Sequence, residues 1–273
     1  MRGEFLDLNG TRLYYYAAGT RGAGEPVVFL HGFPTSSHLW SDVVPLIPAG
    51  HRVVVLDLLG YGRSDRPLGR RVDLLAHAGR VVHLLDELQI ERACIVGHGI
   101  GGGIAQSLAV RQPKRVSRLC LVDSVGFDRW PTFEARIARA ALPLAQFLPV
   151  EALVAVLRRD LLRGYSDPAR AAHSLDLYLR PFAGPDGRDA LVAHIRALTS
   201  GETTDIAVDL ASVRAPTAIV WGQNDRVIPI SIARRLQQAI PKATLEVLPG
   251  MKHFTPEEAP RQVADVIAGL LAR

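Results

Sequence analysis

Hydrophobic residues along the chain form short continuous runs that alternate with longer stretches of helical spacing. The short runs are residues 26–30, 53–58, 93–96, 116–122, 217–221 and 244–248. Continuous apolar runs of about four to eight residues, bounded by turn residues, are typical of strands buried on both faces. Helical spacing predicts helices over 39–47, 72–88, 104–110, 231–240 and 256–271. This alternation predicts right-handed crossovers and a parallel sheet.

Two parts of the chain depart from that alternation. At the start, residues 4–8 and 11–18 flank Asn9-Gly10, a turn signal that predicts an antiparallel hairpin. From 128 to 212 the helical stretches are broken by proline and glycine, and no buried-strand pattern occurs. We therefore expect an all-helical insertion, a cap at 128–212, over a core formed by 1–127 and 213–273.

The most informative stretch is the glycine-rich turn that follows the run at 93–96. A strand, a sharp turn and a helix in succession are the layout of a nucleophile elbow, whose pattern G-x-S-x-G would place serine at position 99. The residue there is Gly99. Gly97, Gly99 and Gly102 also satisfy G-x-G-x-x-G, with Asp123 further along, as a dinucleotide-binding turn requires. This stretch alone leaves both interpretations open.

Three further segments favour the elbow. His31-Gly32-Phe33-Pro34 follows a strand, where the amide of Phe33 and that of Ile100 would form a two-donor oxyanion hole. Asp225 and His253 each lie in a loop after a buried strand. Elbow, acid and histidine come in the chain order of the α/β-hydrolases.

These segments, with the turn at 57–67, make the chain resemble an α/β-hydrolase with a helical cap over nearly its whole length. The resemblance implies a mostly parallel, eight-stranded sheet with helices on both faces and an all-helical cap insertion. The capped meta-cleavage hydrolases, epoxide hydrolases and haloalkane dehalogenases are the most similar groups. The last two use aspartate at the elbow, and dehalogenases usually place tryptophan beside it. Gly99 and Ile100 match neither pattern.

The resemblance also assigns roles to the candidate site residues. Asp225 would orient His253 and raise its basicity, so that His253 serves as general base. Gly99 would keep the turn without the strain that positive φ imposes on other residues. Replacement of the missing nucleophile by Ser36, Ser37 or Ser124 is not expected. The residues expected to line the substrate pocket are His31, Gly32, Ser124, Trp130, Tyr165 and Tyr178.

Composition narrows the classes of partner. The formal net charge of +5 comes from 32 basic and 27 acidic residues spread along the 273-residue chain, which indicates no nucleic-acid role. Cys94 and Cys120 lie in buried-strand runs, so no disulfide is expected. The first residues lack the apolar core of a signal peptide, so we expect a cytoplasmic protein. The apolar stretch at 138–157 is interrupted by proline and polar residues, so it is expected to be part of the cap and not a membrane span. Contact of this stretch with a membrane surface, as a lid over the pocket, is a minor alternative.

Three functions are compatible with the sequence. The first is an enzyme in which His253 and Asp225 act on a small-molecule substrate without a covalent intermediate, by hydrolysis, elimination, carbon-carbon cleavage or isomerisation. The second is an inactivated ester or carbon-carbon bond hydrolase in which Gly99 replaces an original serine. The third is a ligand-binding pseudoenzyme. No metal or organic cofactor is expected, and capped members of the family are often monomers or homodimers.

Overall fold

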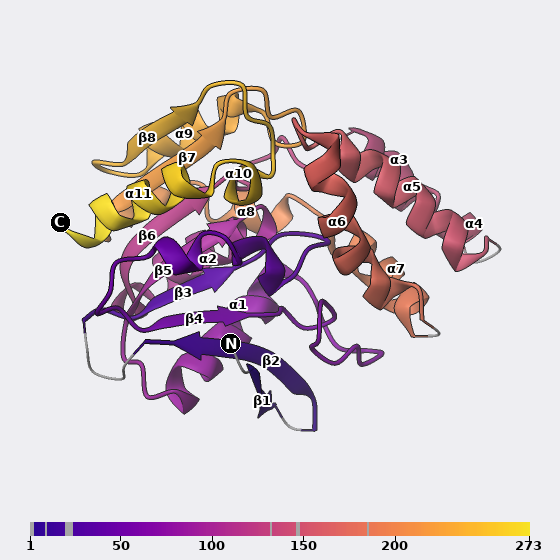
Figure 1. Cartoon of the computed structure of the whole chain (residues 1–273), viewed down its shortest axis with the longest axis horizontal. Helices are drawn as coiled ribbons and strands as arrows, with labels where there is room; N and C mark the ends of the chain where they lie inside the picture. The colour runs from indigo at the N-terminus through magenta and orange to yellow at the C-terminus, as the bar shows by residue number, and fades with distance from the viewer. Residues whose placement is uncertain (1–2, 9, 20–23, 132, 146–147, 185) are drawn as a thin grey trace.

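The protein is described from a computed structural model, which describes residues 3–8, 10–19, 24–131, 133–145, 148–184 and 186–273. Its centre is an eight-stranded sheet with the strand order β1-β2-β4-β3-β5-β6-β7-β8 (Figure 1). The strands are β1 (Gly3–Asp7), β2 (Arg12–Ala18), β3 (Val27–Leu30), β4 (Val53–Leu56), β5 (Ala93–His98), β6 (Val116–Val122), β7 (Thr217–Gly222) and β8 (Thr244–Leu248).

The pairing of the strands confirms the predicted, mostly parallel sheet. β1 pairs antiparallel with β2, and β2 with β4, whereas all other neighbours are parallel. Every residue of β3, β4, β5 and β7 is buried, as continuous apolar runs require. In the turn between β1 and β2, Gly10 has φ +78°, and Asn9 lies outside the described residues.

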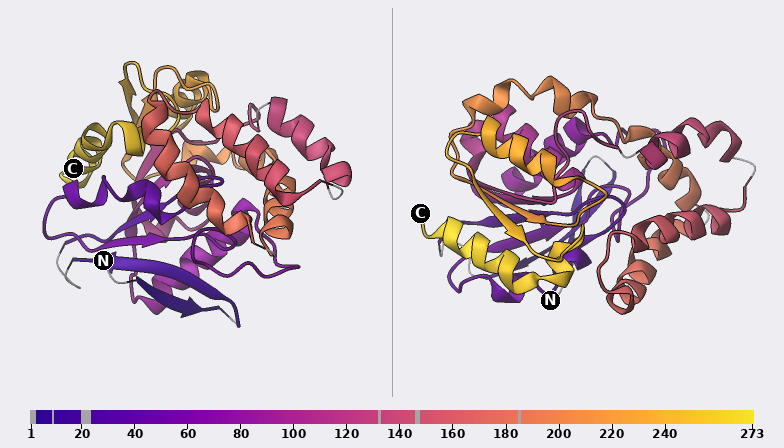
Figure 2. Two further views of the ribbon diagram at one scale, coloured as in Figure 1. Left: turned by 45° about the vertical axis from the view of Figure 1, so that its right-hand side comes forward. Right: turned by 90° about the horizontal axis from the view of Figure 1, so that it is seen from above.

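Long helices cover both faces of this sheet. They are α1 (Leu74–Glu87), α2 (Ile100–Arg111), α9 (Ile230–Ala239) and α11 (Pro260–Leu271). The view from above shows α9 and α11 on opposite faces (Figure 2, right). α11 packs on β6 and β7, and α1 and α2 pack on each other. The sheet therefore has the doubly covered arrangement that the alternating pattern predicts.

Prolines account for two differences from the predicted helices. The prediction of one helix over 39–47 is wrong. The structure has two short 3-10 helices there, η1 (Ser37–Trp40) and η2 (Val44–Leu46). Pro45 lacks the amide hydrogen and crowds the preceding turn, so no continuous helix passes through it. The predicted C-terminal helix is divided into α10 (Thr255–Glu258) and α11, because Pro260 is favoured at the start of a helix.

Helix α2 begins four residues earlier than the pattern predicts, because its first turn is built of glycine. A Cβ on Gly101 would lie 2.3 Å from the Leu30 carbonyl oxygen, and one on Gly102 would lie 2.0 Å from Ser124 Oγ. A pattern of apolar side chains cannot reveal a helical turn made of glycine, because glycine has no side chain. These glycines allow α2 to approach the ends of β3 and β6, which brings its N-terminus to the candidate site.

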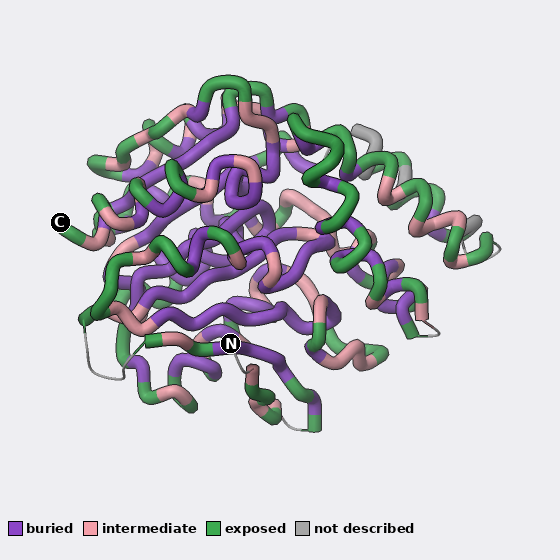
Figure 3. Tube along the Cα trace, viewed as in Figure 1, coloured by how far each residue is buried: buried purple, intermediate pink, exposed green. Residues whose placement is uncertain are grey.

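All described elements between β6 and β7 are helical. They are α3 (Phe133–Ala140), α4 (Leu142–Ala145), α5 (Val150–Leu162), α6 (Pro168–Leu179), η4 (Arg180–Phe182), α7 (Gly187–Ala197), α8 (Gly201–Asp205) and η5 (Asp209–Ser212); a further short helix, η3 (Pro113–Arg115), precedes β6. Figure 1 shows α3 to α7 grouped beside the sheet, and Figure 3 shows α5 as far more exposed than the strands. We call residues 128–212 the helical insertion; these exact bounds stay a prediction. Among the described residues, no helix combines the length and apolar character needed to cross a membrane.

Candidate active site

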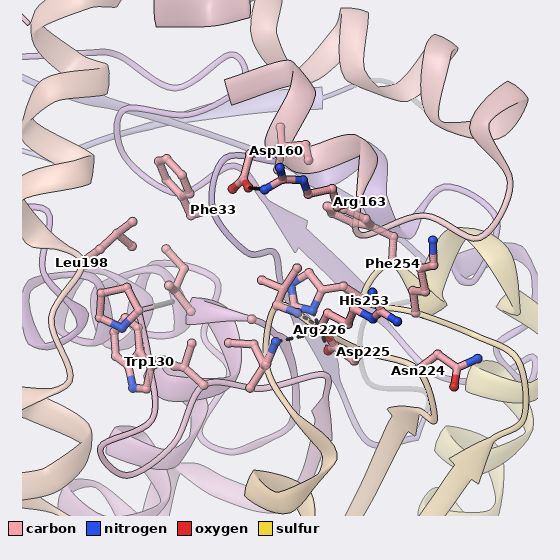
Figure 4. Close-up of a pocket in the computed structure, with 18 of the residues that line it drawn as sticks. Phe33, Trp130, Asp160, Arg163, Leu198, Asn224, Asp225, Arg226, His253 and Phe254 are labelled. Carbon is pink, nitrogen blue, oxygen red and sulfur yellow. Dashed lines mark hydrogen bonds and ion pairs between the residues drawn. The ribbon is translucent and has the colours of Figure 1, made fainter. Parts of the chain in front are cut away.

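A cavity of about 1020 Å³ lies between the carboxyl ends of the strands and the helical insertion (Figure 4). Gly99 and Ile100 line it after β5, Asp225 after β7 and His253 after β8. Helix α5 closes it from the other side. Ligands of open α/β sheets bind at this edge because the loops that follow parallel strands converge there.

Gly99 has the backbone conformation of a sharp strand-to-helix turn. Its φ is +54° and its ψ is −121°, and α2 begins at the next residue. A Cβ built on Gly99 would lie 3.4 Å from Gly32 Cα and 4.0 Å from His253 Nε2, both ordinary contact distances. A side chain at this position would therefore face the imidazole of His253 without a clash.

His253 and Asp225 form a buried pair. His253 Nδ1 lies 2.8 Å from Asp225 Oδ2, while Asp225 Oδ1 accepts hydrogen bonds from the amides of Val227 at 2.7 Å and Ile228 at 2.9 Å. A carboxylate so placed favours the proton on Nδ1, which leaves Nε2 free to accept a proton on the side of Gly99. Figure 4 shows the imidazole and the carboxylate in contact at the cavity wall.

The electrostatic surroundings raise the pKa of His253. Burial by itself lowers that pKa, but the charge of Asp225, its hydrogen bond to the ring and the charge of Asp123 together outweigh burial. The pKa of His253 therefore lies above its ordinary value of 6.5. A stronger base results, whose neutral form is the one that can accept a proton.

Asp123 connects the loops behind this pair. At the end of β6 it is fully buried, accepts the amide of Gly222 at 2.8 Å and accepts the hydroxyl of Thr255. Burial raises the pKa of Asp123 well above its ordinary value, and the charge of Asp225 raises it further. Asp123 thus joins β6 to β7 and to α10, and its carboxyl is engaged with protein groups.

The sequence predicts an oxyanion hole formed by two backbone amides. Phe33 and Ile100 both line the cavity beside Gly99. Across the part of the chain that the structure describes, neither amide has an acceptor. The amide of Ile100 is also the first of α2, where the helix dipole favours negative charge.

Three of the residues expected in the pocket lie behind its wall. His31 Nε2 accepts the amide of Leu58 at 2.9 Å, so this ring joins the loop after β3 to the loop after β4. Gly32 packs against the elbow. Ser124 accepts from Gln106 at 2.9 Å and donates to the carbonyl of Val125 at 2.8 Å. Its hydroxyl is therefore occupied in holding α2 to the segment after β6.

The aromatic residues expected in the pocket divide between two places. Trp130 lines the cavity, and its indole donates to Thr203 Oγ1 at 2.8 Å. Tyr165 and Tyr178 lie in the interface between the insertion and α10. The ring of Tyr165 stacks on Phe254 with centroids 4.1 Å apart, and Tyr178 donates its hydroxyl to Glu257.

The residues of α5 that line the cavity were not predicted from the sequence, although Trp130 of the insertion was. Leu157 and Leu161 line the cavity from α5, and the ion pair of Asp160 with Arg163, 3.3 Å apart, lies beside Phe33 in Figure 4. The spacing of the two leucines, four residues apart, indicates a common helix face and was the available signal. The spacing of these leucines does not indicate which face of α5 packs toward the core. Within the described ranges, no group of three or more His, Cys, Asp or Glu side chains is arranged to hold a metal ion.

Comparison with known proteins identifies the family. The family described as alpha/beta hydrolase fold matches residues 25–260. The chain belongs to this family. A 2-hydroxy-6-oxononadienedioate/2-hydroxy-6-oxononatrienedioate hydrolase of Cupriavidus pinatubonensis is 32% identical over 243 residues, covering 85% of this chain and 82% of that protein. A 2-hydroxymuconate semialdehyde hydrolase of a Pseudomonas species is 30% identical, covering 94% and 92%.

A solved structure supports the same assignment. An alpha/beta hydrolase fold protein from Burkholderia ambifaria superimposes with a TM-score of 0.90 at 28% identity, covering 99% of this chain and 97% of that one. The chain is therefore similar to hydrolases across its length. Family membership favours the elbow interpretation of the glycine-rich turn over dinucleotide binding.

Proposed function

We propose that this α/β hydrolase is an enzyme that acts on a small, apolar carbonyl or ester-like substrate by general-base chemistry, without a covalent intermediate. One observation carries the proposal. His253 Nε2 faces Gly99, which has no nucleophilic side chain, while Nδ1 is held by Asp225 at 2.8 Å. A polarised base in a cavity without an elbow nucleophile is suited to removing a proton from water or from the substrate itself.

In the hydrolytic form of the reaction, a water beside Gly99 donates its proton to His253 Nε2. The water oxygen attacks the carbonyl carbon, and the carbonyl electron pair moves to its oxygen. The amides of Phe33 and Ile100 stabilise this oxyanion, each donor contributing about 3 to 4 kcal/mol. Collapse of the tetrahedral species breaks the bond to the leaving group, which receives the proton from His253.

In the alternative form, His253 removes a proton from the substrate in an elimination, a carbon-carbon cleavage or an isomerisation. The same two amides then stabilise the enolate-like oxygen. The apolar part of the cavity wall suits a substrate of either kind: it includes Val125, Trp130, Leu157 and Leu198. The names of the two curated relatives, both hydrolases, support the hydrolytic form.

A second candidate is favoured by the geometry of the elbow. Because a Cβ on Gly99 meets nothing closer than 3.4 Å, a serine fits there opposite His253. The chain is then the frame of a serine hydrolase in which glycine replaces the nucleophile. A ligand-binding pseudoenzyme is the third candidate, although a receptor has less use for the buried pair of Asp225 and His253.

Turnover of short-chain p-nitrophenyl esters by the unaltered chain and by His253→Ala tests the proposal. Loss of a general base lowers the rate by about 10²- to 10⁴-fold. His83→Ala is the matched control, because His83 is exposed on α1 and does not line the cavity. Equal turnover by the unaltered protein and His253→Ala would overturn the general-base role. Ligand binding without turnover of any ester or carbonyl compound would favour the pseudoenzyme.

A further inference from the structure

The loop that carries His253 is joined to the helical insertion along a short segment. Residues 163–167, between α5 and α6, lie against residues 250–258, which include His253 and α10. We call the first the 163–167 segment and the second the histidine loop. Figure 4 shows Arg163 and Phe254, one from each, close together above His253.

The contacts between the two run over most of their length. The carbonyl of Gly164 accepts the amide of His253 at 2.9 Å, and Lys252 Nζ donates to the carbonyl of Tyr165 at 2.7 Å. Ser166 Oγ donates to the carbonyl of Gly250 at 3.1 Å. The Tyr165 ring stacks on Phe254 at an interplanar angle of 18°. The insertion therefore holds the backbone of the proposed base itself, in addition to forming a cavity wall.

His253 is held through its main chain on two sides. Its amide donates to Gly164 in the insertion, and its carbonyl accepts from His98 Nε2 at 2.9 Å on the side of the elbow. The position of the imidazole relative to Asp225 and Gly99 depends on this backbone. A shift of the 163–167 segment would directly change the hydrogen bond from the His253 amide to the Gly164 carbonyl.

One side chain fixes the 163–167 segment to α10. Glu258 Oε1 accepts the amides of Ser166 at 2.6 Å and Asp167 at 2.8 Å. Bonds from amides to a carboxylate are about twice as strong as those to neutral acceptors. Glu258 does not line the cavity, so it has no part in substrate contact.

We propose that Glu258 is a positioning residue for His253, acting through the 163–167 segment and the carbonyl of Gly164. The inference rests on the proposed role of His253 as general base. By holding two amides of the insertion against the start of α10, Glu258 keeps the Gly164 carbonyl at the His253 amide and the imidazole aligned with Asp225. Displacement of the insertion at this segment thereby disengages the base.

Amide hydrogen exchange and histidine NMR, both without substrate, test the proposal. In Glu258→Ala we expect the His253 amide to exchange about tenfold faster or more, because the segment that protects it is released. We also expect the pKa of the His253 imidazole to fall, since contact with Asp225 is loosened. With any substrate that the enzyme turns over, kcat falls while KM is retained.

Two variants separate positioning from the loss of a charge. Glu258→Gln keeps an acceptor oxygen, and we expect protection within about threefold of the unaltered protein. Asp265→Ala removes an exposed carboxylate from α11 and leaves the His253 amide unchanged. If the His253 amide exchanges no faster in Glu258→Ala than in the unaltered protein, the positioning role is overturned.

A second perturbation covers the case in which Glu258→Ala does not fold. A Cβ on Gly164 would lie 2.7 Å from Phe254 Cε2, so Gly164→Ala moves the segment away from the histidine loop. It should accelerate exchange at the His253 amide in the same way, and unchanged protection would overturn the proposal. Because exchange needs no turnover, this failure is distinct from the result with His253→Ala, which tests the general base.

Discussion

Replacement of Gly99 by serine should introduce a nucleophile at a small cost in stability. The nearest atom to a new Cβ is Gly32 Cα at 3.4 Å, so no neighbour has to move. The cost comes from the backbone, because φ is +54° and side chains at positive φ cost about 1 to 3 kcal/mol. Replacing glycine also reduces the conformational entropy of the unfolded chain, which stabilises the folded protein by about 0.4 to 1 kcal/mol. We expect a net destabilisation of about 1 to 2 kcal/mol, which lowers Tm by roughly 2 to 8 °C for a chain of this size.

Thermal unfolding and labelling by a fluorophosphonate, read as a mass shift, measure both halves of this prediction. Gly99→Ala has the same backbone strain and no hydroxyl, so it should lose the same stability and remain unlabelled. Gly99→Ser should label, and His253→Ala in that background should abolish labelling because the base no longer activates the hydroxyl. Destabilisation above about 5 kcal/mol in either variant would show that a side chain at position 99 does clash with its neighbours. A stable Gly99→Ser protein that resists labelling would show that a side chain at position 99 does not face His253.

Three further predictions concern charge. First, kcat/KM should rise with pH through the pKa of His253, above 6.5, because only the neutral imidazole accepts a proton; a profile that falls over this range would contradict it. Second, Asp225→Asn should lower that pKa, move the profile to lower pH and reduce kcat by about 10³- to 10⁴-fold, measured against the unaltered protein. Third, burial lowers the pKa of His194 to about 3, below the ordinary 6.5, so the unfolded chain binds more protons and stability falls as pH drops below 6.5. Between pH 7.5 and 5 the unaltered protein should lose about 2 kcal/mol of stability through His194, and urea unfolding of His194→Gln should show this loss removed.

Much of the core was predictable because its strands are buried on both faces. Such strands appear in the sequence as continuous apolar runs, and β5 and β6 begin where those runs begin. The elbow was predictable for a related reason. Positive φ at Gly99 favours glycine because a Cβ there is strained, and the close backbone approach at Gly101 leaves no room for a side chain.

The cavity wall in the insertion was not predictable to the same degree. Tyr165 and Tyr178 were expected in the pocket, yet they are buried against α10, at Phe254 and Glu257. An aromatic side chain gains as much from packing against the core as from lining a cavity, and its position in the sequence does not distinguish the two. The proposed role of Glu258 depends on two backbone amides 91 and 92 residues away in the chain, which no local pattern encodes.

If His253 acts without a covalent intermediate, the intact protein carries no part of the substrate during turnover, and its mass shows this. The unaltered protein is mixed with excess p-nitrophenyl ester, the reaction is quenched during steady turnover, and the mass of the intact protein is measured by mass spectrometry. We expect an unmodified protein of 29.7 kDa, and a Gly99→Ser control that carries the acyl group. An acyl adduct on the unaltered chain, at Ser36, Ser37, Ser124 or any other residue, would contradict it.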